Sequence, residues 1–352
     1  MTDAKKTSVP RSARRRAFAG CGVAALAVPL LLAAVPSQAQ AQDAAAWAKI
    51  VAAAKREGRV SYYSAANPAP LARIVDGFKK AHPDIVIDFQ RIPSGPLLTK
   101  LDQERGSGAE GADVANATEI NWFLARGKEG KLLRPVGPAT REWPAKYLLD
   151  GSIVIAAMEP LIVSWNTARV PNPPKNYADL LRPEFKGRLG LSELASVAVV
   201  AWYDWVEKSQ GSGYVAKLRA HNPKLYVGSV PIAQAVASGE ISVGGFGTPT
   251  SVKPLKDSGA PIDYFVPSPG LGIRYALAGF SWGKNPNAAL VLLDYIMSRD
   301  GQTAWHSNGE TASPLNGIPG ALSAASIDPF DPNLYPPEVE RKFREDWNKA
   351  FK

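Results

Sequence analysis

Short apolar runs alternate with helical patterns along this chain, and the alternation constrains the fold more than any other feature. "RVSYYSA" (59–65) is typical of a strand, and "PLARIVDGFKKAHP" (70–83) carries apolar residues at helical spacing. "DIVIDFQR" (84–91) predicts a second strand. A helix with Ser94 as its N-cap and a third strand, "ADVANA" (112–117), come next. Strand–helix–strand–helix–strand in this order predicts an α/β fold with a largely parallel sheet.

The glycine run "GSGAEG" (106–111) matches the G-x-G-x-x-G pattern of dinucleotide-binding proteins. That pattern binds phosphate only where it follows a strand and opens a helix, because free N–H groups at the helix N-terminus hold the phosphate. Here the glycines follow a predicted helix and precede a strand. They therefore predict a helix stop and a loop, and we expect no cofactor.

A second series of strands and helices begins near Pro160. The predicted elements are strands within 160–170, 188–193 and 273–282, a helix over 196–209, a helix–turn–strand unit over 229–247 and one long amphipathic helix over 285–305. Two short connections, near 158–165 and 266–275, predict paired crossings between two lobes. We expect a discontinuous first lobe (42–158 and 268–352), a second lobe (159–267) and a Pro-rich tail on the surface.

Residues 1–41 predict an export signal that is removed. An arginine triplet, 14–16, precedes the apolar run 23–36, and Ala39 and Ala41 form an A-x-A cleavage site. The triplet also matches the twin-arginine pattern R-R-x-F, so export by either the Sec or the twin-arginine route is open. We expect the mature protein in the periplasm.

Charge and cysteine content exclude several classes of function. Cys21 is the only cysteine and lies in the predicted signal, so the mature chain has no thiol for a disulfide, a metal or a nucleophile. The net charge is +9, and six basic residues and one acid in 1–41 leave 9 − 5 = +4 for the rest. A dispersed charge of this size does not indicate nucleic-acid binding, which needs a clustered basic face. It is compatible with an anionic ligand.

Several passages, in the same order, resemble the periplasmic substrate-binding proteins of ABC importers, in the extracellular solute-binding group that includes ferric-iron binders. The passages are "EGRVSYYSA…LARIVDGFKKAHPDIVI", "GADVANA", "VSWNT", "PKNYADLLRPEFKGRLGL", "AQAVASGEISVG" and "NPNAALVLLDYIMSRDGQ". The resemblance implies a type II-like fold of two α/β lobes, each a mostly parallel sheet flanked by helices, joined by hinge strands. It also implies a monomer without enzymatic activity that closes on one solute. The implied partners are an ABC permease and its ATPase.

The resemblance leaves the ligand open. Ferric binders of this group typically use adjacent tyrosines, and in register with them this chain has Pro249 and Thr250. The position that often carries histidine is Asn67. Both departures favour a small organic anion (a carboxylate, phosphonate or phosphate ester) and no metal site, with a ferric-iron or iron–anion binder as the alternative. An exported hydrolase is a third hypothesis, but no histidine accompanies a G-x-S-x-G or H-E-x-x-H motif.

Candidate ligand contacts follow the ends of predicted strands, where open α/β sheets bind ligands. The candidates are Ser64, Asn67, Arg91, Ser94, Gly95, Asn116, Thr118 and Glu119 in the first lobe, Ser192, Glu193, Ser196, Thr248 and Thr250 in the second, and Arg274 and Tyr275 near the hinge. We interpret Arg91, beside a helix N-terminus, as an anion seat that Arg274 also reaches. The alternatives are simple helix capping by Thr118 or Glu119 and a structural ion pair for Arg274.

Overall fold

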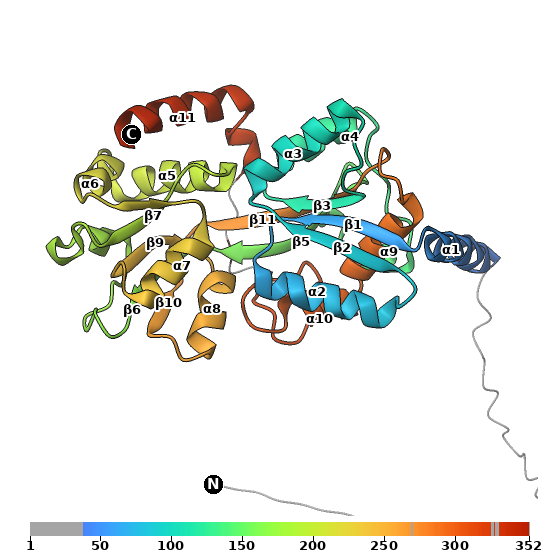
Figure 1. The fold of residues 1–352 in the computed structure, drawn as a ribbon, viewed down its shortest axis with the longest axis horizontal. Coiled ribbons are helices and arrows are strands. Elements are labelled where there is room, and N and C mark those ends of the chain that lie inside the picture. Colours follow the sequence, from blue (N-terminus) through green and yellow to red (C-terminus); the bar gives the residue numbers. More distant parts are fainter. Residues whose placement is uncertain (1–37, 269, 325–326, 328–330, 352) are drawn as a thin grey trace, which may run out of the picture. The chain divides into compact units, whose positions relative to one another are not determined.

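A mixed sheet of six strands forms the first lobe, in the order β2-β1-β3-β11-β5-β4 (Figure 1). Its strands are β1 (Arg59–Ser64), β2 (Val86–Arg91), β3 (Val114–Ala117), β4 (Leu148–Leu149), β5 (Ile153–Pro160) and β11 (Gly272–Gly279). β2, β1 and β3 are parallel, whereas β11 runs antiparallel to both β3 and β5. The computed structural model describes residues 38–268, 270–324, 327 and 331–351, so Cys21 and most of the predicted export signal lie outside the described residues.

Helices cover both faces of this sheet. α3 (Ser94–Ser107) and α4 (Ile120–Lys128) lie on one face, and α2 (Pro68–Ala81), α9 (Pro286–Met297) and α10 (Arg299–His306) lie on the other (Figure 1). α2 begins with proline, which is favourable in the first turn, and it buries Leu71, Ile74, Val75 and Phe78 at helical spacing. The first predicted strand–helix–strand unit is therefore confirmed.

The second lobe contains a five-stranded mixed sheet in the order β10-β6-β9-β7-β8. The strands are β6 (Ile162–Asn166), β7 (Leu189–Ser192), β8 (Lys224–Tyr226), β9 (Val243–Gly247) and β10 (Ile262–Phe265), and the helices are α5 (Val197–Gln210), α6 (Tyr214–Ala220), α7 (Ser229–Ser238) and α8 (Pro249–Asp257). β7 is parallel to β8 and β9, and β6 is antiparallel to β9 and β10. Both sheets thus have parallel cores, and the predicted two-lobe α/β class is confirmed.

The remaining elements are not part of the two sheets or of the helices named above. They are α1 (Gln38–Glu57), α11 (Pro337–Phe351) and the 3₁₀ turns η1 (Pro138–Arg141), η2 (Ala145–Tyr147), η3 (Tyr177–Leu181), η4 (Pro183–Phe185) and η6 (Pro332–Leu334). The helix α11 packs against α5 and α6, although it follows first-lobe elements in the chain. None of the described helices is long and apolar enough to cross a membrane.

Two local predictions about helices are wrong. The segment 285–305 forms two helices, because Ser298 is extended (ψ 162°) and its side chain accepts a hydrogen bond from the Gly301 N–H, capping α10. Ser94 is the first residue of α3, and Pro93 occupies the N-cap position. The prediction for the glycine run is confirmed, since Gly108 ends α3 in the left-handed region with φ 71°.

Candidate functional site

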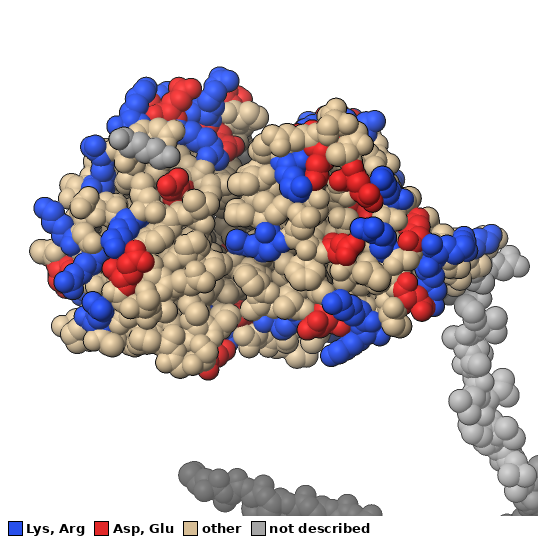
Figure 2. Space-filling view, viewed as in Figure 1, with Lys and Arg blue, Asp and Glu red and all other residues tan. Residues whose placement is uncertain are grey.

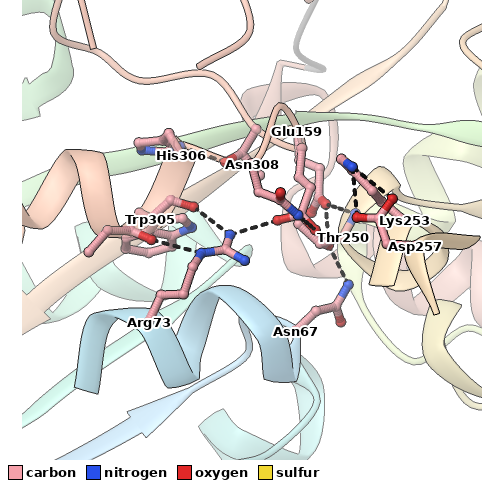
Figure 3. A network of polar contacts seen from close by, with 12 residues as sticks. Asn67, Arg73, Glu159, Thr250, Lys253, Asp257, Trp305, His306 and Asn308 are labelled. Carbon is pink, nitrogen blue, oxygen red and sulfur yellow. Dashed lines mark hydrogen bonds and ion pairs between the residues drawn. The ribbon is translucent and has the colours of Figure 1, made fainter. Parts of the chain in front are cut away.

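Asn67, at the end of β1, joins the first lobe to the second. It occupies the N-cap position of α2, yet its side chain does not cap that helix. Its Nδ2 atom instead donates hydrogen bonds to Thr248 Oγ1 at 3.0 Å and to Thr250 Oγ1 at 2.6 Å (Figure 3). Both threonines lie at the N-terminus of α8, directly after β9. Three sequence-predicted candidates are therefore brought together across the two lobes.

Glu159, at the end of β5, is a carboxylate that the sequence analysis missed. Its Oε1 accepts hydrogen bonds from the hydroxyl and from the N–H of Thr250 (3.3 Å for the N–H), and its Oε2 accepts one from the Tyr275 hydroxyl at 3.1 Å. Burial raises the pKa of Glu159 to about 7 and the pKa of Tyr275 well above its ordinary value. The sequence feature that could have identified Glu159 is its position as the single charged residue in the otherwise apolar run "IVIAAMEP".

Arg91, at the end of β2, lies beside this network and forms no ion pair with any described Asp or Glu. Its Nη2 donates to Asn67 Oδ1 at 3.3 Å, and its Nε is buried with no hydrogen-bond partner among the described residues. Burial lowers the pKa of the Arg91 guanidinium. An unpaired buried donor on a cation favours an acceptor of negative charge.

Asn116, at the end of β3, offers a second unused donor. Its Oδ1 accepts from the hydroxyls of Ser64 at 2.6 Å and Tyr62 at 3.2 Å, whereas its Nδ2 is buried without a partner among the described residues. Tyr62 is a fully buried core residue. The predicted candidates Ser64 and Asn116 thus form one cluster.

The start of α3 and the end of β3 meet the second lobe at another point. Ser94 Oγ accepts from the Thr118 N–H at 3.1 Å, and Glu119 Oε1 accepts from the Val197 N–H of α5 at 3.3 Å. Burial raises the pKa of Glu119 to about 7. A Cβ atom on Gly95 would lie 2.6 Å from the Ala195 carbonyl oxygen. The two lobes are therefore in direct contact here.

The remaining second-lobe candidates lie at the end of β7 and before α5. Ser192 ends β7 and Glu193 follows it, whereas α5 begins at Val197 with Ser196 at the N-cap position and without a side-chain cap hydrogen bond. The Ser192 hydroxyl donates to the main-chain oxygen of Glu193 at 2.9 Å. Neither Thr118 nor Glu119 caps α4 with its side chain.

A groove of about 1230 Å³ opens between the two lobes at this contact. Gly95, Glu119 and Glu193 line it together with residues of α4, α5 and α11. Figure 2 shows the corresponding hollow between the side of the molecule that carries α11 and the side that carries α3 and α4, with positive and negative side chains interspersed around it. Three predicted residues thus line this groove, and five others belong to the buried network around Asn67, namely Asn67, Arg91, Thr248, Thr250 and Tyr275.

Arg274 does not join Arg91, which corrects the expectation that both reach one anion. It precedes Tyr275 in β11, and successive residues of a strand point to opposite faces. Tyr275 faces Glu159, whereas Arg274 lies with its cross-strand partner Met158 in a different cavity.

The described residues hold no group of three or more His, Cys, Asp or Glu side chains that could bind a metal ion.

The family model for bacterial extracellular solute-binding proteins matches residues 60–310. The chain belongs to this family. No curated protein sequence matches it.

Solved structures share the fold of this solute-binding protein. It is similar to a substrate-binding protein of an ABC transporter from Agrobacterium tumefaciens, with a TM-score of 0.75, 18% identity and coverage of 84% of this chain and 94% of that chain. It is also similar to AfuA of Actinobacillus pleuropneumoniae with fructose-6-phosphate bound, with a TM-score of 0.69, 21% identity and coverage of 84% of this chain and 98% of that chain. A third similar structure is iron-bound HitA of Pseudomonas aeruginosa, with a TM-score of 0.64, 18% identity and coverage of 82% of this chain and 98% of that chain.

Membership assigns the general role of the chain. It is an extracellular solute-binding protein of a non-enzymatic family. Its ligand is therefore a solute.

Proposed function

We propose that this solute-binding protein captures a small organic anion (a carboxylate, phosphonate or phosphate ester) between its lobes in the periplasm. It delivers the anion as a monomer to a permease driven by an ATPase. The ligand contacts are side chains of the network around Asn67 and of the groove between the lobes, and Arg91 binds the negatively charged group.

The observation that supports this proposal is the unpaired guanidinium of Arg91. It lies between the strand ends of the first lobe and the threonines of the second, and its Nε is buried without a partner among the described residues. A buried N–H of this half-buried cation is costly while it has no acceptor, and a bound anion removes that cost through a charge-assisted hydrogen bond. The unused amide donor of Asn116 adds to the preference for an acceptor-rich ligand.

The similar structures are consistent with this ligand class, since AfuA holds fructose-6-phosphate, a phosphorylated organic anion. Iron-bound HitA represents the alternative. In this chain, however, Asn67, Thr248 and Thr250 occupy the centre of the network, and neutral amide and hydroxyl groups are weaker ligands for Fe(III) than phenolates. The organic anion is therefore the better-supported ligand.

A thermal-shift screen of the purified protein tests the proposal. The screen covers small carboxylates, phosphonates, phosphate esters including fructose-6-phosphate, and Fe(III) with and without citrate. A ligand at 100 times its dissociation constant stabilises the folded state by about 2.7 kcal/mol, which is readily measured. We expect a shift with one organic anion.

Variants of Arg91 complete the test. Arg91→Ala should abolish the shift, and Arg91→Lys should recover it only in part, because lysine lacks the planar fork that binds an oxyanion with two hydrogen bonds. The control is Arg219→Ala, an exposed arginine of α6 in the second lobe. A shift with Fe(III) alone, or an anion-induced shift that Arg91→Ala leaves unchanged, contradicts the proposal.

A further inference from the structure

A second cavity, of about 710 Å³, lies on the face of β5 and β11 that points away from Glu159 and Tyr275. Met158 and Arg274, which pair across these strands, line it from one side, and residues within 313–324 line it from another. The main chain of Ala312 exchanges two hydrogen bonds with Met158, at 3.0 and 2.8 Å. The strand and the loop are thereby held together, so the cavity is part of the fold.

The charged side chains of this cavity are all positive. Among the described residues that line it, Lys146 and Arg274 are charged and no Asp or Glu is present. Neither cation forms an ion pair with a described carboxylate. The Nε of Arg274 is buried and has no hydrogen-bond partner among the described residues. Such a donor costs free energy until an acceptor reaches it.

Neutral polar groups surround these cations. Lys146 Nζ lies 4.9 Å from the centroid of the Tyr147 ring, a cation–π contact that places the ammonium over the ring face. Tyr147 and Asn316 also line the cavity and add a phenol and an amide. A guanidinium and an ammonium combined with neutral donors form the chemistry that binds oxyanions.

We propose that this cavity is a second anion-binding site, separate from the interlobe site of Arg91, and that it takes a small multivalent oxyanion. Arg274 and Lys146 provide the charge, and Arg274 Nε provides a buried hydrogen bond. Phosphate and a di- or tricarboxylate share this chemistry. The two arginines thus serve two different sites, one on each face of β5 and β11.

Isothermal titration calorimetry of the purified protein tests this site with two probes, inorganic phosphate and citrate. We expect at least one probe to bind, and we expect Arg274→Ala and Lys146→Ala each to weaken it by about tenfold or more. Lys146 is exposed, so its replacement keeps the fold even if Arg274→Ala destabilises it. Arg219→Ala, the same control as above, should leave binding unchanged.

The Arg91→Ala variant separates the two proposals. Binding of phosphate or citrate should persist in Arg91→Ala, whereas the solute bound between the lobes is lost there and retained in Arg274→Ala. The second site is rejected if neither probe binds the wild-type protein, if Lys146→Ala binds as tightly as the wild type, or if Arg91→Ala abolishes binding of the probes. The last result would place the anion between the lobes and would still support the proposed function.

Discussion

The amide of Asn67 lies 2.6 Å from the hydroxyl of Thr250, although 183 positions separate the two residues in the chain. The contact joins the N-terminus of α2 in the first lobe to that of α8 in the second. It places two predicted candidates opposite each other and connects through Thr250 to Glu159, where the chain crosses between the lobes. Side chains at the proposed ligand site therefore make contacts between the two lobes.

Asn67→Ala should destabilise the protein. It leaves the Oγ1 atoms of Thr248 and Thr250 and the Nη2 of Arg91 without their Asn67 partner. Loss of a buried hydrogen-bond partner costs about 1–3 kcal/mol of the free energy of unfolding. Urea denaturation measures the change, with the exposed Asn172→Ala as the control. An unfolding midpoint equal to the wild type's would mean that the hydrogen bonds of Asn67 contribute nothing to stability.

The stability of the protein should fall as the pH rises from 5 to 7, and Glu159 should account for part of that fall. Burial raises the pKa of Glu159 from its ordinary value of 4.5 to about 7, so the folded state holds a proton in this range that the unfolded state has released. One such proton changes the free energy of unfolding by up to about 1.4 kcal/mol per pH unit, in favour of the lower pH.

Glu159→Gln tests this linkage because glutamine keeps the shape of the side chain and cannot ionise. In this variant, the free energy of unfolding should depend less steeply on pH, because the proton bound by Glu159 no longer contributes. Glu119, whose pKa is also raised to about 7, keeps its own contribution to the slope. Glu338→Gln, on the exposed surface of α11, is the control. An unchanged slope in Glu159→Gln would show that this carboxyl does not bind the proton.

Local sequence patterns predicted the order of the strands and helices because each depends on spacing within a few residues. The strand ends were predicted well enough to select Asn67, Arg91, Thr250 and Tyr275, which the structure brings close to one another. Polar residues directly after apolar runs carried that information. Their role as ligand contacts remains a prediction.

The errors come from features that act over longer distances or against the local pattern. Glu159 was missed because the run that contains it was not assigned as a strand, and only its partners Thr250 and Tyr275 show its importance. The apolar pattern continues through Ser298, so the break between α9 and α10 depends on the Ser298 side chain, which caps α10 by accepting from the Gly301 N–H. The placement of Arg274 beside Arg91 ignored the alternation of neighbouring side chains in a strand.

Arg73→Ala should cost much more stability than the loss of an ordinary surface ion pair. Arg73 Nη2 lies 2.6 Å from Glu310 Oε2, and the Glu310 side chain is 0% exposed. Figure 3 shows Arg73 and its hydrogen bond to the main-chain oxygen of Trp305. Removing the cation leaves a buried carboxylate without its counter-charge, which costs about 3–5 kcal/mol. Lys342→Ala removes an exposed pair with Asp346 and should cost less than about 1 kcal/mol. Equal losses in chemical denaturation would contradict this difference.

Gly95→Ala should hold the lobes apart without weakening either of them. The added Cβ would lie 2.6 Å from the main-chain oxygen of Ala195, closer than real Cβ contacts occur, so one lobe must move away from the other. We expect a larger radius of gyration in small-angle X-ray scattering and an affinity about tenfold lower for the anion that shifts the melting temperature in the screen.

Gly106→Ala is the matched control, since it lies in the same helix α3 and its Cβ would meet no atom within 4 Å. It should leave the affinity unchanged and stabilise the helix by about 0.5–1 kcal/mol, because alanine loses less conformational entropy on folding than glycine. If Gly95→Ala matches Gly106→Ala in both scattering and affinity, the contact between Gly95 and Ala195 does not limit closure. If Gly95→Ala alone opens the protein, the approach of α3 to the second lobe is a requirement for holding the ligand.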